Sequence, residues 1–226
     1  MTKLRESIHL DYVTVKPYFT IKSMLVYALI ALFLTTMSAS ITSGLGVGLM
    51  IATLFVSYPF ALSEKNNLDA LYATLSVNRK TVVQGRYIFT LLINIAAVLC
   101  ACVLSAAGLL IAKAAGFSSG IGAGEGYLAS VLVLSAVFIL VQAIQLPLFF
   151  KLGYAKAKIL SVVPFAVLML SFIVLMTMRN IGTGLEAVIN KLAASGMTIP
   201  VLIVVLAVAV LISYRLSVTF YDKREF

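Results

Sequence analysis

Long stretches of apolar residues without a single charge dominate this chain. Asp, Glu, Lys, Arg and His are absent from residues 23–63, 87–112, 126–150, 159–178 and 192–214. A helix needs about 20 mostly apolar residues, each rising about 1.5 Å, to cross the hydrocarbon core of a bilayer. The first run is long enough for two such helices and each of the others for one. The sequence therefore predicts an all-α integral membrane protein with six transmembrane helices.

The first run must reverse direction once if it holds two spans. We expect this reversal near Ser43-Gly44-Leu45-Gly46, because glycine permits a tight turn at the membrane surface. Residues 1–226 then form a single transmembrane domain. The expected spans are residues 22–42, 45–63, 87–112, 127–150, 159–178 and 199–219.

The distribution of basic residues orients these spans. If the N-terminus lies inside, the inner segments hold 14 of the 17 Lys and Arg residues. The outer segments hold only Lys113, Arg179 and Lys191. Cytoplasmic loops of membrane proteins carry an excess of Lys and Arg. Both termini are therefore expected in the cytoplasm.

Composition supports this reading and excludes other classes. Of the 226 residues, 62% are hydrophobic and 11% are charged, against about 25% charged in a typical soluble domain. The net charge of +9 lies in short segments beside the spans. There it attracts the anionic inner leaflet, so we expect a lipid membrane and no nucleic acid as its partner. Glu6 and Asp11 argue against a cleavable signal sequence.

Residues 1–21 are expected to form an amphipathic interfacial helix. An apolar stripe recurs there at helical spacing, formed by Leu4, Ile8, Tyr12, Val15 and Phe19. Glu6 and His9 fall away from that stripe, and Pro17 is expected to break or bend the helix before the first span. The segment fits a helix lying on the inner leaflet, and it also fits a loosely ordered amphipathic tail.

The segment 64–86 is the one sizeable cytosolic loop, and it carries its own helical pattern. Leu68, Leu71, Tyr72 and Leu75 are spaced i, i+3, i+4 and i+7, and Asn67 is placed as the N-cap. A short helix cannot bury such a stripe alone, so either the membrane surface or another protein covers it. We favour a partner protein.

Two further helices are expected beside the spans. Asn78 is placed to cap a helix that continues through Arg86 into the third span. On the outer side, Leu185, Val188, Ile189 and Leu192 have helical spacing. Residues 179–198 are therefore expected to form an extracellular or re-entrant helix.

No catalytic or metal-binding constellation is found in the sequence. Its one histidine, His9, has no cluster of cysteines or carboxylates nearby. No acidic residue lies within a span, which disfavours a proton- or sodium-driven carrier. The phosphate-loop motif Gly-x4-Gly-Lys-Ser/Thr is absent. If ATP drives this protein, a separate chain must bind it.

A few polar residues within the spans are candidates for lining a substrate path. They are Thr53, Ser57, Gln142 and Gln145. Hydrogen bonds between membrane helices, worth about 0.6 kcal/mol each, are the alternative explanation. We favour helix–helix bonding for the hydroxyls, and for the glutamines both interpretations stand.

The layout resembles the ABC-2 type permeases, membrane subunits of bacterial ABC exporters, and particularly the short branch of the phenol-soluble-modulin exporter type. The most specific similarity lies within residues 58–87. It consists of EKNNL at 64–68, LYATL at 71–75, NRKTVV at 78–83 and GRY at 85–87. Members commonly have Leu-Pro where this chain has Leu75-Ser76.

The resemblance implies a type V ABC exporter-like fold in the bacterial cytoplasmic membrane. It implies a cytosolic coupling helix between spans two and three that docks into an ATPase. The residues that match the ATPase contact are Leu68, Asp69, Leu71, Tyr72, Thr74 and Leu75. It also implies a second permease copy or paralogue in a homo- or heterodimer. This chain is then a transport subunit and no enzyme, with ATP and Mg bound by the partner ATPase.

The charge-free interior suits a hydrophobic or amphipathic substrate, such as a peptide, an antimicrobial or a lipid-like molecule. Two other classes of function stand as alternatives. One is a stand-alone secondary carrier, and the other is a non-transporting immunity or sensor protein of the membrane.

Overall fold

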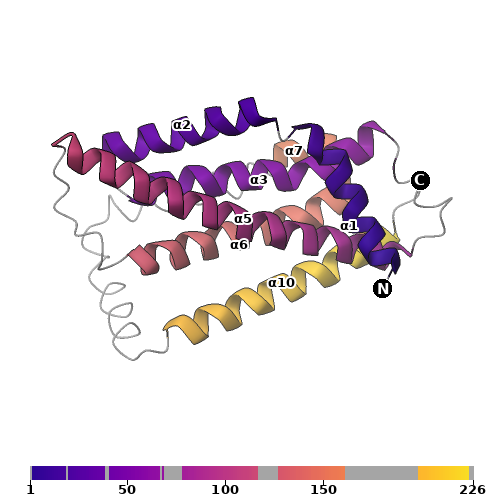
Figure 1. Ribbon diagram of the computed structural model, residues 1–226. Helices are drawn as coiled ribbons and strands as arrows, with labels where there is room; N and C mark the ends of the chain where they lie inside the picture. Colours follow the sequence, from indigo (N-terminus) through magenta and orange to yellow (C-terminus); the bar gives the residue numbers. More distant parts are fainter. Residues whose placement is uncertain are drawn as a thin grey trace. The chain divides into compact units, whose positions relative to one another are not determined.

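The computed structural model describes residues 2–18, 20–38, 41–66, 68, 78–116, 127–160 and 198–223, and every regular element there is helical. The first elements are α1 (Thr2–Val15), the 3-10 helix η1 (Lys16–Tyr18), α2 (Ile21–Ser38) and α3 (Ile41–Lys65). They are followed by α5 (Arg79–Ala114), α6 (Tyr127–Leu152), α7 (Tyr154–Leu160) and α10 (Thr198–Asp222) (Figure 1). The predicted all-α class is confirmed for this part of the chain.

Four helices are long and apolar enough to cross a membrane. They are Ser43–Lys65, Arg79–Ala114, Val131–Leu152 and Pro200–Asp222, and a shorter apolar helix covers Ile21–Met37. The four coincide with the predicted second, third, fourth and sixth spans, and the shorter helix coincides with the first. The predicted fifth span, 159–178, and the helix expected over 179–198 lie outside the described residues except at their ends.

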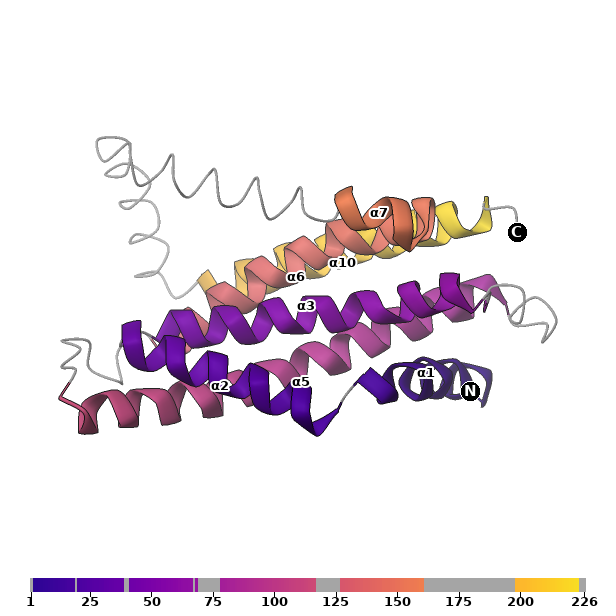
Figure 2. The ribbon, with the colours of Figure 1, turned by 90° about the horizontal axis from the view of Figure 1, so that it is seen from above.

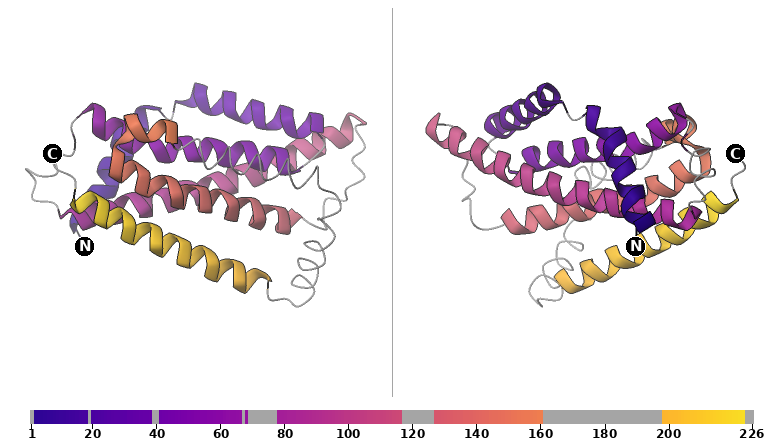
Figure 3. Two further views of the ribbon diagram at one scale, coloured as in Figure 1. Left: turned by 180° about the vertical axis from the view of Figure 1, so that it is seen from behind. Right: turned by 45° about the vertical axis from the view of Figure 1, so that its right-hand side comes forward.

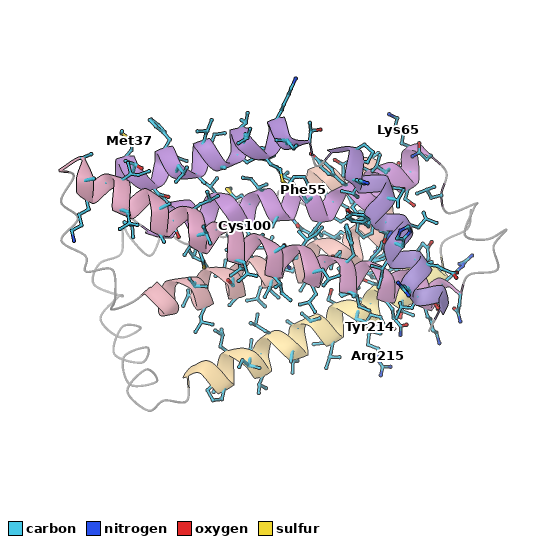
Figure 4. All side chains as sticks on the ribbon, in the orientation of Figure 1. Met37, Phe55, Lys65, Cys100, Tyr214 and Arg215 are labelled. Carbon is cyan, nitrogen blue, oxygen red and sulfur yellow. The ribbon has the colours of Figure 1, made fainter. Side chains whose placement is uncertain are left out.

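The surfaces of these helices are those of lipid-facing segments. Leu99 and Val103 of α5 are 63% and 69% exposed, and Ile203 and Leu211 of α10 are 59% and 62% exposed. Figure 4 shows such side chains projecting along the lengths of the helices. Soluble proteins rarely expose contiguous apolar surface of this extent, whereas hydrocarbon chains solvate it well. The chain is therefore a multi-helix membrane protein.

The described residues divide into two compact units, one ending at Phe138 and one beginning at Ile139. In the first, α2, α3 and α5 pack on one another, and α1 packs on α5 and α3. Figures 1 and 3 show α1 crossing α5 near the end at which α5 begins. In the second, α6 and α10 meet near their C-terminal ends, where the rings of Phe150 and Tyr221 lie 5.4 Å apart.

The predicted reversal at Ser43-Gly44-Leu45-Gly46 is wrong, because these residues lie within α3. α2 ends at Ser38 and α3 begins at Ile41, so the break falls before this segment. Gly44 is needed for close packing instead. A Cβ built at Gly44 would collide with the Thr35 hydroxyl of α2 and lie 3.3 Å from the Cβ of Ser105 in α5. The glycine therefore lets three helices approach one another.

Thr35 lies at the centre of this contact and is fully buried. Its hydroxyl donates to the carbonyl of Ala31 in its own helix at 2.7 Å, so the polar group is satisfied locally. On the α5 side, a Cβ at Gly108 would lie 2.8 Å from the Cβ of Thr35. Small residues at such contacts are typical of packing between membrane helices.

The break expected at Pro17 is confirmed. α1 ends at Val15, Pro17 lies in η1, and α2 begins at Ile21. Proline lacks a backbone N–H and cannot continue a regular helix without losing a hydrogen bond. The N-terminal helix and the first apolar helix are therefore separate elements that meet at an abrupt change of direction (Figure 2).

Candidate functional site

The roots of the loop that is expected in the cytosol are the end of α3 and the beginning of α5. α3 ends at Lys65, and Figure 4 shows this residue at the tip of the helix. α5 begins at Arg79, one residue after Asn78, whose side chain accepts a hydrogen bond from the Lys80 backbone N–H at 3.1 Å. The predicted Asn78 cap and the helix that it starts are confirmed. Because α5 has 36 residues, about 54 Å of rise, it is longer than a hydrocarbon core of about 30 Å is thick.

The N-terminal helix packs onto these roots through an unexpected face. Ser7, Asp11 and Val15 are 3%, 1% and 0% exposed, and they succeed one another at steps of four along α1. The predicted apolar stripe is only partly correct. Val15 is buried and Leu4 and Ile8 are partly buried, but Tyr12 is 49% exposed.

The face of α1 is rotated toward polar residues because α5 offers it a gap and a charge. A Cβ built at Gly85 would lie 2.7 Å from Ser7 Oγ and 3.3 Å from Ser7 Cβ. The absence of a side chain at Gly85 therefore lets the backbone of α1 approach α5 closely. One residue further, Arg86 reaches the Asp11 carboxylate.

Asp11 and Arg86 form a buried ion pair between α1 and α5. The Arg86 Nε atom lies 4.0 Å from Asp11 Oδ1, and the two side chains are 4% and 1% exposed. The guanidinium carbon of Arg86 also lies 4.3 Å from the centroid of the Phe60 ring in α3. A buried charge is costly unless an opposite charge or an aromatic face compensates for it. Arg86 has both, and through them it connects three helices.

An apolar cluster adjoins the ion pair. Val15 of α1, Leu62 of α3 and Phe89 of α5 form a buried core, and Tyr58 and Ile93 pack against it. Phe55, midway along α3 (Figure 4), makes edge-to-face contacts with Tyr27 of α2 and Tyr58 at centroid distances of 6.2 and 5.4 Å. We call the ion pair, Phe60 and this cluster the root junction, because they join α1 to both roots of the loop.

The residues predicted to contact an ATPase belong to the loop that leaves this junction. Leu68 is described and is buried, with 9% of its surface exposed. Asp69, Leu71, Tyr72, Thr74 and Leu75 lie outside the described residues, as does Asn67, the predicted N-cap.

The candidates for a substrate path fall into the two units of the chain. In the first, Thr53 is buried and donates to the carbonyl of Leu49 at 3.0 Å, and Ser57 donates to the carbonyl of Leu54 at 2.7 Å. These hydroxyls are thus engaged within α3. In the second unit, Gln142 and Gln145 are 2% and 4% exposed.

Two serines of α10 are buried in the same unit as the glutamines. Ser213 and Ser217 are 2% and 0% exposed. They precede Tyr221 by two turns and one turn of helix, as Gln142 precedes Phe150 by about two turns in α6. Phe150 and Tyr221 are in contact, so the two helices approach each other at this end. The sequence analysis missed both serines.

The sequence analysis also missed the ion pair, although a signal for it existed. Asp11 lies three residues after Ile8 and four before Val15, so it shares their face of the helix. Arg86 is the last charged residue before the charge-free run 87–112. An isolated carboxylate on an apolar helical face and an isolated cation at a membrane boundary are natural partners.

Within the part of the chain that the structure describes, no three His, Cys, Asp or Glu residues are grouped to hold a metal ion. The described residues show instead an N-terminal helix, α1, packed on two helices, α3 and α5, that are long and apolar enough to cross a membrane. These features define a helical membrane protein in which α1, α3 and α5 meet at a packed junction.

Comparison with protein-family models assigns that class to a family. The model described as ABC-2 family transporter protein matches residues 8–222, so the chain belongs to the ABC-2 transporter family. It is therefore a permease, the membrane component of an ABC transporter. Comparison with curated proteins and with solved structures gave no match.

Proposed function

We propose that this chain is the permease subunit of an ATP-driven exporter of the bacterial cytoplasmic membrane. It works with a separate ATPase chain and with a second permease copy or paralogue. Family membership supports the transport role. The absence of a phosphate-loop motif from the sequence supports an ATPase on another chain, which would bind ATP and Mg²⁺.

The root junction is the observation that supports the loop as the place of ATPase contact. Both roots of the loop are fixed in one buried cluster, through Leu62 of α3 and Phe89 of α5. Close-packed interiors deform little and pass displacement on to their neighbours. A push on the loop would therefore move the last turns of α3 and the first turns of α5 together. The proposed contact residues are Leu68, Asp69, Leu71, Tyr72, Thr74 and Leu75.

The proposed substrate is hydrophobic or amphipathic, such as a peptide, an antimicrobial or a lipid-like molecule. Of the candidate lining residues, the hydroxyls of Thr53 and Ser57 are engaged by carbonyls of their own helix. Gln142 and Gln145, which are buried in the second unit, are proposed to contact polar groups of such a substrate, because an amide side chain can both donate and accept hydrogen bonds.

Replacing the anchor of the proposed contact tests this function. Leu71→Ala combined with Tyr72→Ala should release the ATPase during purification while the permease stays folded, because apolar and aromatic anchors dominate small interfaces. Lys113→Ala, at the opposite end of α5, is the control and should retain the ATPase. Undiminished co-purification and ATP-dependent transport in the double variant would contradict the proposal.

The energy source separates the proposal from a secondary carrier. Export by the reconstituted complex should require hydrolysable ATP and should persist when an ionophore dissipates the ion gradients. Loss of export with the ionophore, irrespective of ATP, would favour the carrier. A chain that binds a partner and transports nothing would favour the immunity or sensor function.

A further inference from the structure

We propose that Asp11 and Arg86 are a positioning pair that makes α1 move together with the loop roots during the transport cycle. This inference rests on the proposed function, because it assigns to α1 a part in the response to the ATPase. It concerns residues that do not contact the substrate. Their role is to fix where α1 sits on α5.

The geometry shows why this pair connects moving parts. Asp11 belongs to α1, and Arg86 lies two turns after the start of α5 at Arg79. The Phe60 ring, 4.3 Å from the guanidinium carbon, belongs to the last turns of α3. A displacement of either loop root would therefore reach α1 through Arg86.

A second layer of contacts lies one helical turn further along. Val15 of α1 is in the same buried cluster as Leu62 of α3 and Phe89 of α5. The two layers together hold α1 at two points, Asp11 and Val15. An element held at two points follows rotation as well as translation of the helices that hold it.

The first layer of contacts is ionic, and this indicates a role other than packing. Replacing a buried ion pair by apolar residues of similar volume is often neutral for stability, so such a pair is weak evidence of a stabilising role. Apolar surfaces tolerate sliding, whereas two opposite buried charges compensate for each other only when they face one another, which favours one register. The pair therefore suits the task of keeping α1 in register with α5 while force passes between them.

The test uses two fluorescent reporters in the full complex with its ATPase, in a Cys100→Ser, Cys102→Ser background. One label is attached at Val13→Cys, which is 49% exposed on α1, and the other at Lys80→Cys, exposed at the start of α5. Trapping the complex with ADP and vanadate should shift the emission of both labels in the otherwise unchanged protein.

Three variants then isolate the pair. In Asp11→Asn, and in Asp11→Leu combined with Arg86→Met, the label at position 80 should still respond and the response at position 13 should be clearly diminished, because only the Val15 contact then holds α1. The exchanged pair, Asp11→Arg with Arg86→Asp, should restore it. Ser7→Ala, one turn away on the same buried face, is the matched control and should leave both responses intact.

The outcomes distinguish this inference from the function on which it rests. If position 80 responds throughout and position 13 responds equally with and without the pair, the positioning role is overturned and the proposed function survives. If no ATPase accompanies the chain, or if neither label responds to nucleotide trapping in the unchanged protein, the proposed function fails and the positioning role fails with it.

Discussion

At the scale of single residues, the most consequential feature is a carboxylate buried on a helix face that also carries Ile8 and Val15. Asp11 is 1% exposed and Arg86 is 4% exposed. Burying either charge alone costs several kcal/mol, so the position of each is explained by the other. The two residues are 75 positions apart in the sequence. The helical periodicity of α1 alone therefore does not reveal that they are partners.

The stability of single and double variants should reflect that coupling. Asp11→Ala leaves the Arg86 guanidinium buried without this carboxylate and should lower the free energy of unfolding by about 3–5 kcal/mol. Asp11→Leu with Arg86→Met should cost much less, because no charge is left buried. Chemical unfolding in detergent micelles, followed by circular dichroism, measures both.

Glu6→Ala is the control for this comparison. Glu6 is exposed on the same helix, so its replacement should change the free energy of unfolding by no more than about 0.5 kcal/mol. Equal destabilisation by the single and double changes at Asp11 and Arg86 would show that packing volume, and not charge, governs the site.

At the scale of elements, glycines decide how closely the spanning helices approach. Gly44 faces the Thr35 hydroxyl, whereas a Cβ at Gly46, two residues along the same helix, would meet nothing within 4 Å. Both glycines lie in the same charge-free run of the sequence, but only Gly44 lies close to another helix. This is why the sequence predicted a reversal where the structure has a helix contact.

The pair of glycines offers a matched experiment. Gly44→Ala places a methyl group against Thr35 and Ser105 and should destabilise the protein by about 1–3 kcal/mol through overpacking. Gly46→Ala should be neutral or stabilising by up to about 1 kcal/mol, because alanine favours the helix. Thermal unfolding of the two variants in one detergent compares them directly. Equal melting temperatures would contradict the helix contact described for Gly44.

Other elements were predictable because their signals are local. Asn78 caps α5 through a bond to Lys80, and Pro17 separates α1 from α2, each acting within a few residues of its own position. Charge-free runs likewise located the helices 41–65, 79–114, 127–152 and 198–222. Tyr12, in contrast, was placed on the wrong face of α1. Its exposure depends on Gly85 and Arg86, which lie on another helix.

At the scale of the whole molecule, composition and family membership agree. A chain that is 62% hydrophobic exposes apolar side chains along α5 and α10, and it belongs to the ABC-2 transporter family. Two of its charged contacts, the Asp11–Arg86 ion pair and the contact of Arg86 with the Phe60 ring, lie at the root junction, where α1 meets the first turns of α5. A buried charged pair thus lies beside the loop, while α5 and α10 expose apolar side chains that suit a lipid environment.

The central claim is that an ATPase on a separate chain acts on this permease through the loop between α3 and α5. Tyr72 is the aromatic anchor of the proposed contact, so replacing it by the photo-crosslinking residue p-benzoylphenylalanine in cells tests the claim directly. We predict that illumination joins the permease covalently to a cytosolic ATPase, identified by mass spectrometry. The account would be contradicted if the probe at position 72 formed crosslinks to lipid and none to any nucleotide-hydrolysing protein.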